Sequence, residues 1–143
     1  MNGALSPDLT FALSELTRSG CSLAVVHGGV ARLYGGRGVK DLYRLVSDEP
    51  EVLSGASVAD KVVGKGAAAL MAAGGVKEVY ALTVSESALE LLEGEGVMTW
   101  HDRAVPHIVN RSGTGMCPVE RLCAEAGSAA ECVPLIGDFL RSK

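Results

Sequence analysis

Two short stretches of the chain gather residue types that bind ligands or act in catalysis. The first, residues 55–68, reads GASVADKVVGKGAA and contains the candidate site residues Ser57, Asp60 and Lys61. The second, residues 110–120, reads NRSGTGMCPVE and contains the candidates Asn110, Gly113, Thr114, Gly115, Cys117 and Glu120. Carboxylates, an amine, hydroxyls and a thiol are suited to a small polar pocket, and glycines let the backbone approach a ligand closely.

The first stretch is expected to open a long helix over residues 57–74. Ser57 and Asp60 have the S-x-x-D spacing of a capping box, and a glycine pair follows the last apolar residues. Ser57, Asp60 and Lys61 would then lie on one side of the first turns, where a helix N-terminus attracts anions. The alternative is a helix cap followed by a solvated stripe, because caps and exposed lysines are common.

Cys117 is the candidate nucleophile of the second stretch. Pro118 suits the first position of a helix, so Cys117 stands just before that helix, where the helix dipole favours the thiolate. Cys117 is then a nucleophile or a redox thiol, with Asp60 or Glu120 handling protons. The alternative is a small buried residue in a turn, because unpaired cysteines are usually inert core residues.

The Gly113-Thr114-Gly115 run, next to a helix start, is also suited to wrap a phosphate or a carboxylate, with Asn110 as a donor at the rim. The run lacks the G-x-x-x-x-G-K-[ST] pattern of a phosphate-binding P-loop, and no Rossmann G-x-G-x-x-G follows a strand. The ligand class that this reasoning supports is therefore broad, a small anionic or nucleotide-like molecule.

Composition limits the class of protein. The chain has 143 residues, of which 48% are apolar and 18 are glycine, and these values are typical of one tightly packed α/β domain over residues 1–143. The net charge of −4 leaves no broad basic surface, so we expect no nucleic-acid partner. No signal peptide or apolar span is recognised, so we expect a cytoplasmic protein with no membrane partner and reduced cysteines.

The elements that must position these residues alternate between helices and strands. A helix that follows a hairpin and returns to a parallel strand has to cross a sheet face, so we expect a mixed sheet with helices on both faces. The expected elements are a helix over 6–22, a hairpin over 22–34 that turns at residues 28–29, a helix over 39–50, the helix over 57–74, a strand over 76–85, a helix over 86–96, one or two strands over 97–109, a helix over 118–123 and a C-terminal helix over 128–143 that contains Pro134, which breaks or kinks helices.

The two stretches together, GASVADKVVGK and NRSGTGMCPVE, closely resemble a small family of bacterial and archaeal proteins that is catalogued as a domain of unknown function with a cytidine-deaminase-like fold. The resemblance covers a core of about residues 22–123 and leaves the first and last helices outside. It implies a three-layer α/β fold, with helical extensions at both ends. It also implies that Ser57, Asp60 and Lys61 face the second stretch across one pocket.

Zinc deaminases of this fold need three metal ligands and a free glutamate. Here Asp60 stands near the first ligand position, and Val62 stands near the position of the glutamate. Cys117 keeps one thiol of the second motif, but Glu120 stands where the other thiol belongs. This carboxylate-rich set is unusual for zinc, so we expect no metal and no cofactor.

Three functions remain in view. The first is a metal-free pocket that binds a small anionic or nucleotide-like molecule, centred on Asp60, Lys61, Thr114 and Cys117. The second is an enzyme that uses Cys117 as a nucleophile or redox thiol. The third is a non-catalytic regulatory module that self-associates into a homo-oligomer through an exposed sheet edge or helix.

Overall fold

The computed structural model describes residues 4–36, 39–109, 113 and 115–142. Its strands form one mixed five-stranded sheet in the order β2-β1-β3-β4-β5. β1 runs antiparallel to β2 and β3, whereas β3, β4 and β5 are parallel to one another. The strands are β1 (Leu23–His27), β2 (Val30–Tyr34), β3 (Ser57–Val63), β4 (Glu78–Ser85) and β5 (Met98–Val105).

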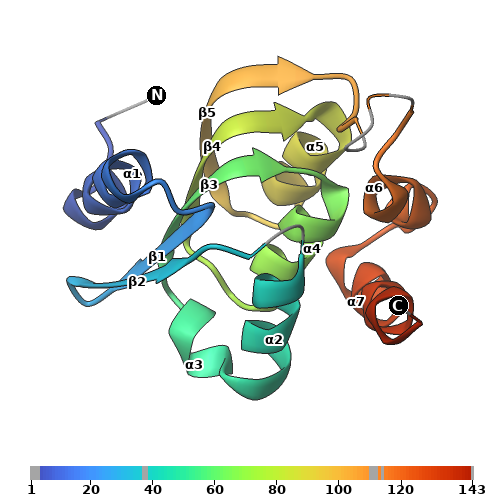
Figure 1. Ribbon diagram of the computed structural model, residues 1–143, viewed down its shortest axis with the longest axis horizontal. Helices are drawn as coiled ribbons and strands as arrows, with labels where there is room; N and C mark the ends of the chain where they lie inside the picture. The colour runs from blue at the N-terminus through green and yellow to red at the C-terminus, as the bar shows by residue number, and fades with distance from the viewer. Residues whose placement is uncertain (1–3, 37–38, 110–112, 114, 143) are drawn as a thin grey trace.

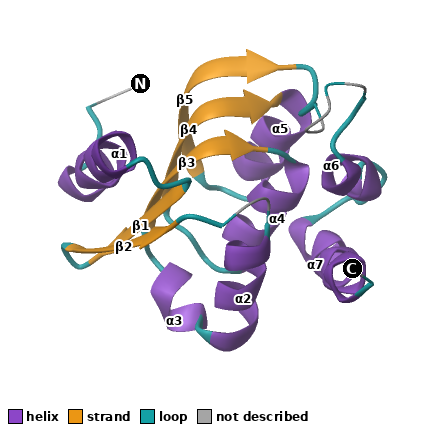
Figure 2. Ribbon diagram, in the orientation of Figure 1, coloured by secondary structure: helices purple, strands orange, loops and turns teal. Residues whose placement is uncertain are grey.

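Helices lie on both sides of this sheet, which gives the predicted three-layer α/β architecture (Figure 1). α1 (Pro7–Ser19) covers one face, over β1 and β3. The other helices lie on the opposite side, as the colouring by secondary structure makes clear (Figure 2). They are α2 (Lys40–Asp48), α3 (Pro50–Leu53), α4 (Lys65–Ala73), α5 (Glu86–Gly94), α6 (Pro118–Cys123) and α7 (Ala129–Arg141).

α1 begins and ends as its sequence predicts. The Ser6 hydroxyl accepts a hydrogen bond from the Leu9 amide at 3.1 Å, and Gly20 leaves the helix with a φ of +76°. Leu9, Ala12 and Leu16 are buried at helical spacing, and the last two pack with apolar residues of β1 and β3. This small core is separate from the main core on the other face.

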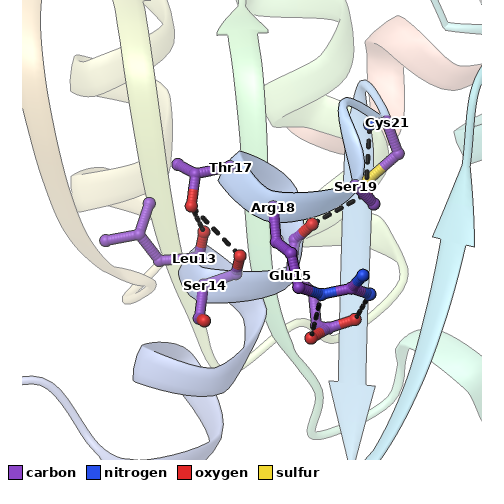
Figure 3. Close-up of polar contacts among 7 residues, drawn as sticks. All are labelled: Leu13, Ser14, Glu15, Thr17, Arg18, Ser19 and Cys21. Carbon is purple, nitrogen blue, oxygen red and sulfur yellow. Dashed lines mark hydrogen bonds and ion pairs between the residues drawn. The ribbon is translucent and has the colours of Figure 1, made fainter.

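The last turns of α1 are reinforced by side chains (Figure 3). The Thr17 hydroxyl donates to the Leu13 carbonyl at 3.2 Å, and the Ser19 hydroxyl donates to the Glu15 carbonyl at 2.7 Å. Arg18 forms an ion pair with the Glu15 carboxylate one turn earlier. The Cys21 amide in turn donates to the Ser19 hydroxyl at 3.2 Å, so this side chain links the last turn of α1 to the residues that follow it.

The expectation of one helix over 57–74 is wrong. Residues 57–63 form β3, and α4 begins only at Lys65, with Gly64 as its N-cap. β3 lies in the centre of the sheet, paired with β1 on one side and β4 on the other. Its β-branched valines suit a strand, and pairing along both edges outweighs the local capping-box signal.

The remaining elements follow the sequence closely. The turn between β1 and β2 has φ values of +59° at Gly28 and +80° at Gly29, as a type I′ hairpin requires. α2 ends at Asp48, two residues before Pro50, and Pro50 is the first residue of the short α3. α7 continues through Pro134 to Arg141 without breaking. No described helix has the length and apolar character needed to cross a bilayer.

α4 lies in the main core and packs against α5, α7 and the sheet. Residues 65–71 of α4 are all buried. A Cβ at Gly66 would overlap Cγ1 of Val119 and lie 3.5 Å from Cδ1 of Ile136. The small residues of this helix are therefore explained by close helix packing.

Candidate functional site

The carboxyl ends of three parallel strands meet at one edge of the sheet. β3 ends at Val63, β4 at Ser85 and β5 at Val105, and Figure 1 shows these three ends on the same side of the sheet. We call this region, the strand ends together with the described residues 106–109, 113 and 115–117, the carboxyl edge. Ligands of open α/β sheets bind at the carboxyl ends of strands, so this edge is the expected place for a ligand.

Asp60 lies at the middle of β3, three residues before the end of the strand at Val63, between Leu23 of β1 and Ala81 of β4. Its side chain is only 8% exposed, and its Oδ1 accepts a long hydrogen bond of 3.4 Å from the Val62 amide. Burial raises the pKa of the Asp60 carboxyl to about 7, although the amides of Val62 and Lys61 act in the opposite direction. Near neutral pH the group is therefore present in both forms and can donate or accept a hydrogen bond.

Lys61 and Ser57 are not brought together with Asp60. Lys61 is exposed, and its Nζ donates to the Gly20 carbonyl at 3.3 Å, at the end of α1. Successive residues of a strand point to opposite faces, which separates the Lys61 amine from the Asp60 carboxyl. Ser57 begins β3, about 10 Å away along the strand. Its hydroxyl donates to the buried Glu78 carboxylate at 2.6 Å.

Glu120 is buried and accepts hydrogen bonds from several elements. One oxygen, Oε2, accepts from the Lys65 amide at 2.8 Å, the Ser85 hydroxyl at 2.6 Å and the Ser87 hydroxyl at 3.2 Å. The other oxygen accepts from the Ile108 amide. This carboxylate is well supplied with donors, and it ties α6 to the starts of α4 and α5 and to the segment after β5. Its position indicates a structural role.

Cys117 is half-buried and is the residue immediately before α6. Its amide donates to the Ile108 carbonyl at 2.7 Å, and Val109 pairs with Met116 in an isolated antiparallel bridge. Gly113 has a φ of +75°, which explains a glycine there. Among the described residues, no hydrogen bond reaches the Cys117 sulfur.

Of the remaining predicted site residues, some lie outside the described part of the chain. Asn110 and Thr114 lie outside the described residues. Gly115 is described and lies beside Arg121 of α6. The possible metal set of Asp60, Cys117 and Glu120 is not assembled, because the described chain contains no group of three or more metal-binding side chains.

Sequence reasoning missed two residues of the carboxyl edge. The Arg121 guanidinium lies 3.8 Å from the position that a Cβ on Gly115 would take, so it places a positive charge at the edge. Gly64 is the second, because a Cβ there would lie 3.1 Å from Ile108 and 3.3 Å from the Glu120 carboxylate. In the sequence, Arg121 is marked only as a basic residue directly after Glu120. Gly64 is marked only as a glycine between the pair Val62-Val63 and Lys65.

Comparisons with known proteins agree with this fold. The family model described as "TM1506: Domain of unknown function (DUF1893)" matches residues 11–140. The crystal structure of the DUF1893 family protein TM1506 from Thermotoga maritima is similar, with 25% sequence identity and a TM-score of 0.87. The alignment covers 96% of this chain and 93% of that chain. No curated protein matches the sequence.

The family match is longer than the core of about residues 22–123 on which the sequence resemblance rested. It includes most of α1 and nearly all of α7, so both terminal helices are part of the shared family region. The chain belongs to the DUF1893 family.

Proposed function

We propose that the carboxyl edge is a binding site for a small nucleotide-like ligand, built without a resident metal on a scaffold of the cytidine-deaminase-like class. The observation that carries the proposal is the buried carboxyl of Asp60 on the central strand β3, three residues before the carboxyl end of that strand. The mixed strand order and the helices on both faces are compatible with the proposed scaffold class.

Asp60 differs from the other buried carboxylates of the described chain. Glu78 accepts hydrogen bonds from the hydroxyls of Ser6 and Ser57, and Glu120 accepts from two amides and two hydroxyls. Among the described donors, Asp60 receives only backbone amides of its own strand, one of them at 3.4 Å. A buried carboxyl with so little support costs free energy, and such groups concentrate at functional sites.

The chemistry of the edge favours a nucleotide-like molecule. A carboxyl that exchanges its proton near neutral pH matches a nucleobase edge, where donor and acceptor atoms stand side by side. The Arg121 guanidinium beside Gly115 offers a partner for a phosphate group at the same edge. Glu120 and Ser57 serve the fold in this proposal, and Lys61 lies outside the site.

Calorimetric titration with the four common nucleoside 5′-monophosphates tests the proposal, with orthophosphate as the probe for simple anion binding. We expect at least one nucleotide to bind more tightly than orthophosphate. Asp60→Asn removes the ionisable group at similar volume, and it should weaken that nucleotide by about tenfold or more. The matched control is Asp48→Asn, because Asp48 is exposed on α2.

Equal nucleotide binding by Asp60→Asn and the unaltered protein would remove Asp60 from the site. Orthophosphate binding as tight as that of every nucleotide would contradict the nucleotide-like class. An absence of binding by all four nucleotides would contradict it as well.

A further inference from the structure

A pocket whose lining includes neither Asp60 nor Cys117 lies between α5 and the connection from α6 to α7. Its volume of about 340 Å³ falls within the range of small-molecule sites. Its lining comes from the first residue of α4, one face of α5 with the residue after it, and the connection between α6 and α7. The lining residues that matter here are Lys65, Ser87, Glu90, Leu91, Glu95 and Gly127.

Lys65 supplies the positive charge of this pocket. The side chain is only 9% exposed, and its Nζ donates to the carbonyls of Ala126 at 2.7 Å and Ala124 at 3.2 Å. An ammonium group has three hydrogens, and the third has no acceptor among the described residues. A buried ammonium with an unused donor is better stabilised when an acceptor enters the pocket, preferably a charged one.

Two carboxylates supply the negative charge. Glu95 Oε2 accepts a hydrogen bond from the amide of Ala129, the first residue of α7, at 3.2 Å. Glu90 is exposed on α5 and has no hydrogen-bond partner among the described residues. With two negative groups and one positive group, the pocket repels a phosphate or another multiply charged anion. It favours a ligand that carries one carboxylate and one ammonium.

We propose that this pocket binds a small zwitterion of the amino-acid class. The ligand carboxylate accepts from the free hydrogen of the Lys65 ammonium, and the ligand ammonium donates to Glu90 and Glu95. Leu91 offers apolar surface to a short side chain at the pocket wall. This inference stands apart from the nucleotide proposal, because no residue of the Asp60 site contributes to it.

Amide chemical-shift titrations of the full chain test the inference with three probes of similar size. L-alanine carries both charges, propionate lacks the ammonium, and ethylamine lacks the carboxylate. We expect L-alanine to shift the amides around the pocket in a saturable way. Propionate and ethylamine should bind at least tenfold more weakly.

A substitution then locates the site. Lys65→Met strands two carbonyls and interferes with folding, so Glu90→Gln is the informative variant. We expect it to weaken L-alanine at least fivefold, whereas Glu93→Gln, an exposed α5 residue that does not line the pocket, leaves binding unchanged. Asp60→Asn should also leave it unchanged, which separates this result from that of the nucleotide test.

Three results would overturn the inference. They are no saturable shift at the pocket with L-alanine, propionate binding as tight as that of L-alanine, or unchanged L-alanine binding in Glu90→Gln.

Discussion

The Ser85 hydroxyl lies 2.6 Å from the Glu120 carboxylate, although 35 positions separate the two residues in the sequence. Ser85 is both the last residue of β4 and the N-cap of α5, where its oxygen also accepts from the Ala88 amide at 3.2 Å. Glu120 adds bonds to the amides of Lys65 and Ile108. One buried carboxylate therefore joins the end of β4, the start of α4 and the segment after β5 to α6 at the carboxyl edge.

Glu120→Ala should lower the free energy of unfolding by about 3 kcal/mol, because it leaves buried donors unsatisfied. Urea denaturation followed by circular dichroism measures the change. Glu125→Ala is the matched control, since Glu125 is exposed just after α6, and its effect should stay within about 0.5 kcal/mol. Similar stabilities for the two variants would show that the bonds to Glu120 do not hold this edge together.

Asp60 should make stability depend on pH in an unusual direction. Its pKa in the folded protein, about 7, lies above that of an aspartate in the unfolded chain, about 3.9, so the folded state holds the proton more tightly. The contribution of this group to stability is therefore full below about pH 4 and falls by about 1.4 kcal/mol per pH unit up to about pH 7.

Asp60→Asn removes this dependence. The variant should gain stability relative to the unaltered protein as the pH rises from 5 to 8, as measured by urea denaturation at each pH. Asp48→Asn should show no such trend, because Asp48 is exposed. A stability difference that is constant across this range would contradict the raised pKa of Asp60.

Gly66→Ala tests the packing of α4. The added Cβ would overlap Val119, a branched side chain on α6, so we expect a loss of about 1–3 kcal/mol in the free energy of unfolding. Gly94→Ala at the end of α5 is the control, because a Cβ there meets nothing within 4 Å. This control should be neutral or stabilising by up to about 1 kcal/mol. A neutral Gly66→Ala would mean that α6 lies farther from α4.

The four cysteines should divide into two classes towards a thiol reagent such as 5,5′-dithiobis(2-nitrobenzoate). Cys21 and Cys117 are half-buried, whereas Cys123 and Cys132 are buried. Burial raises the pKa of Cys123 to about 12 and also raises that of Cys132. We expect two thiols to react in the folded protein and the other two only after unfolding. Rapid reaction of all four would contradict the buried positions.

Local sequence signals predicted most of the fold. Ser6, Pro7 and Gly20 marked the ends of α1, and the glycine pair at 28–29 marked a hairpin turn. The mixed sheet with helices on both faces followed from this order of elements. These features could be predicted because each depends on residues close together in the chain.

The site was harder to predict because it depends on distant contacts. Ser57 and Asp60 have capping-box spacing, but β3 is held as a strand by pairing with β1 and β4, which no local signal reports. The role of Glu120 likewise depends on Ser85 and Ile108, which lie in other elements. The grouping of the two stretches into one site stays a prediction, and the sequence could not show that Glu120 receives several hydrogen bonds from the fold whereas Asp60 receives only backbone amides of its own strand.

The most direct test of the account observes the Asp60 carboxyl itself, by following its ¹³C resonance in nuclear magnetic resonance during pH and nucleotide titrations. We predict a midpoint near pH 7 in the free protein and a saturable shift of the resonance when a nucleoside monophosphate is added. A midpoint near pH 4, or a resonance unaffected by all four nucleotides, would contradict the claim that Asp60 forms the centre of a binding site.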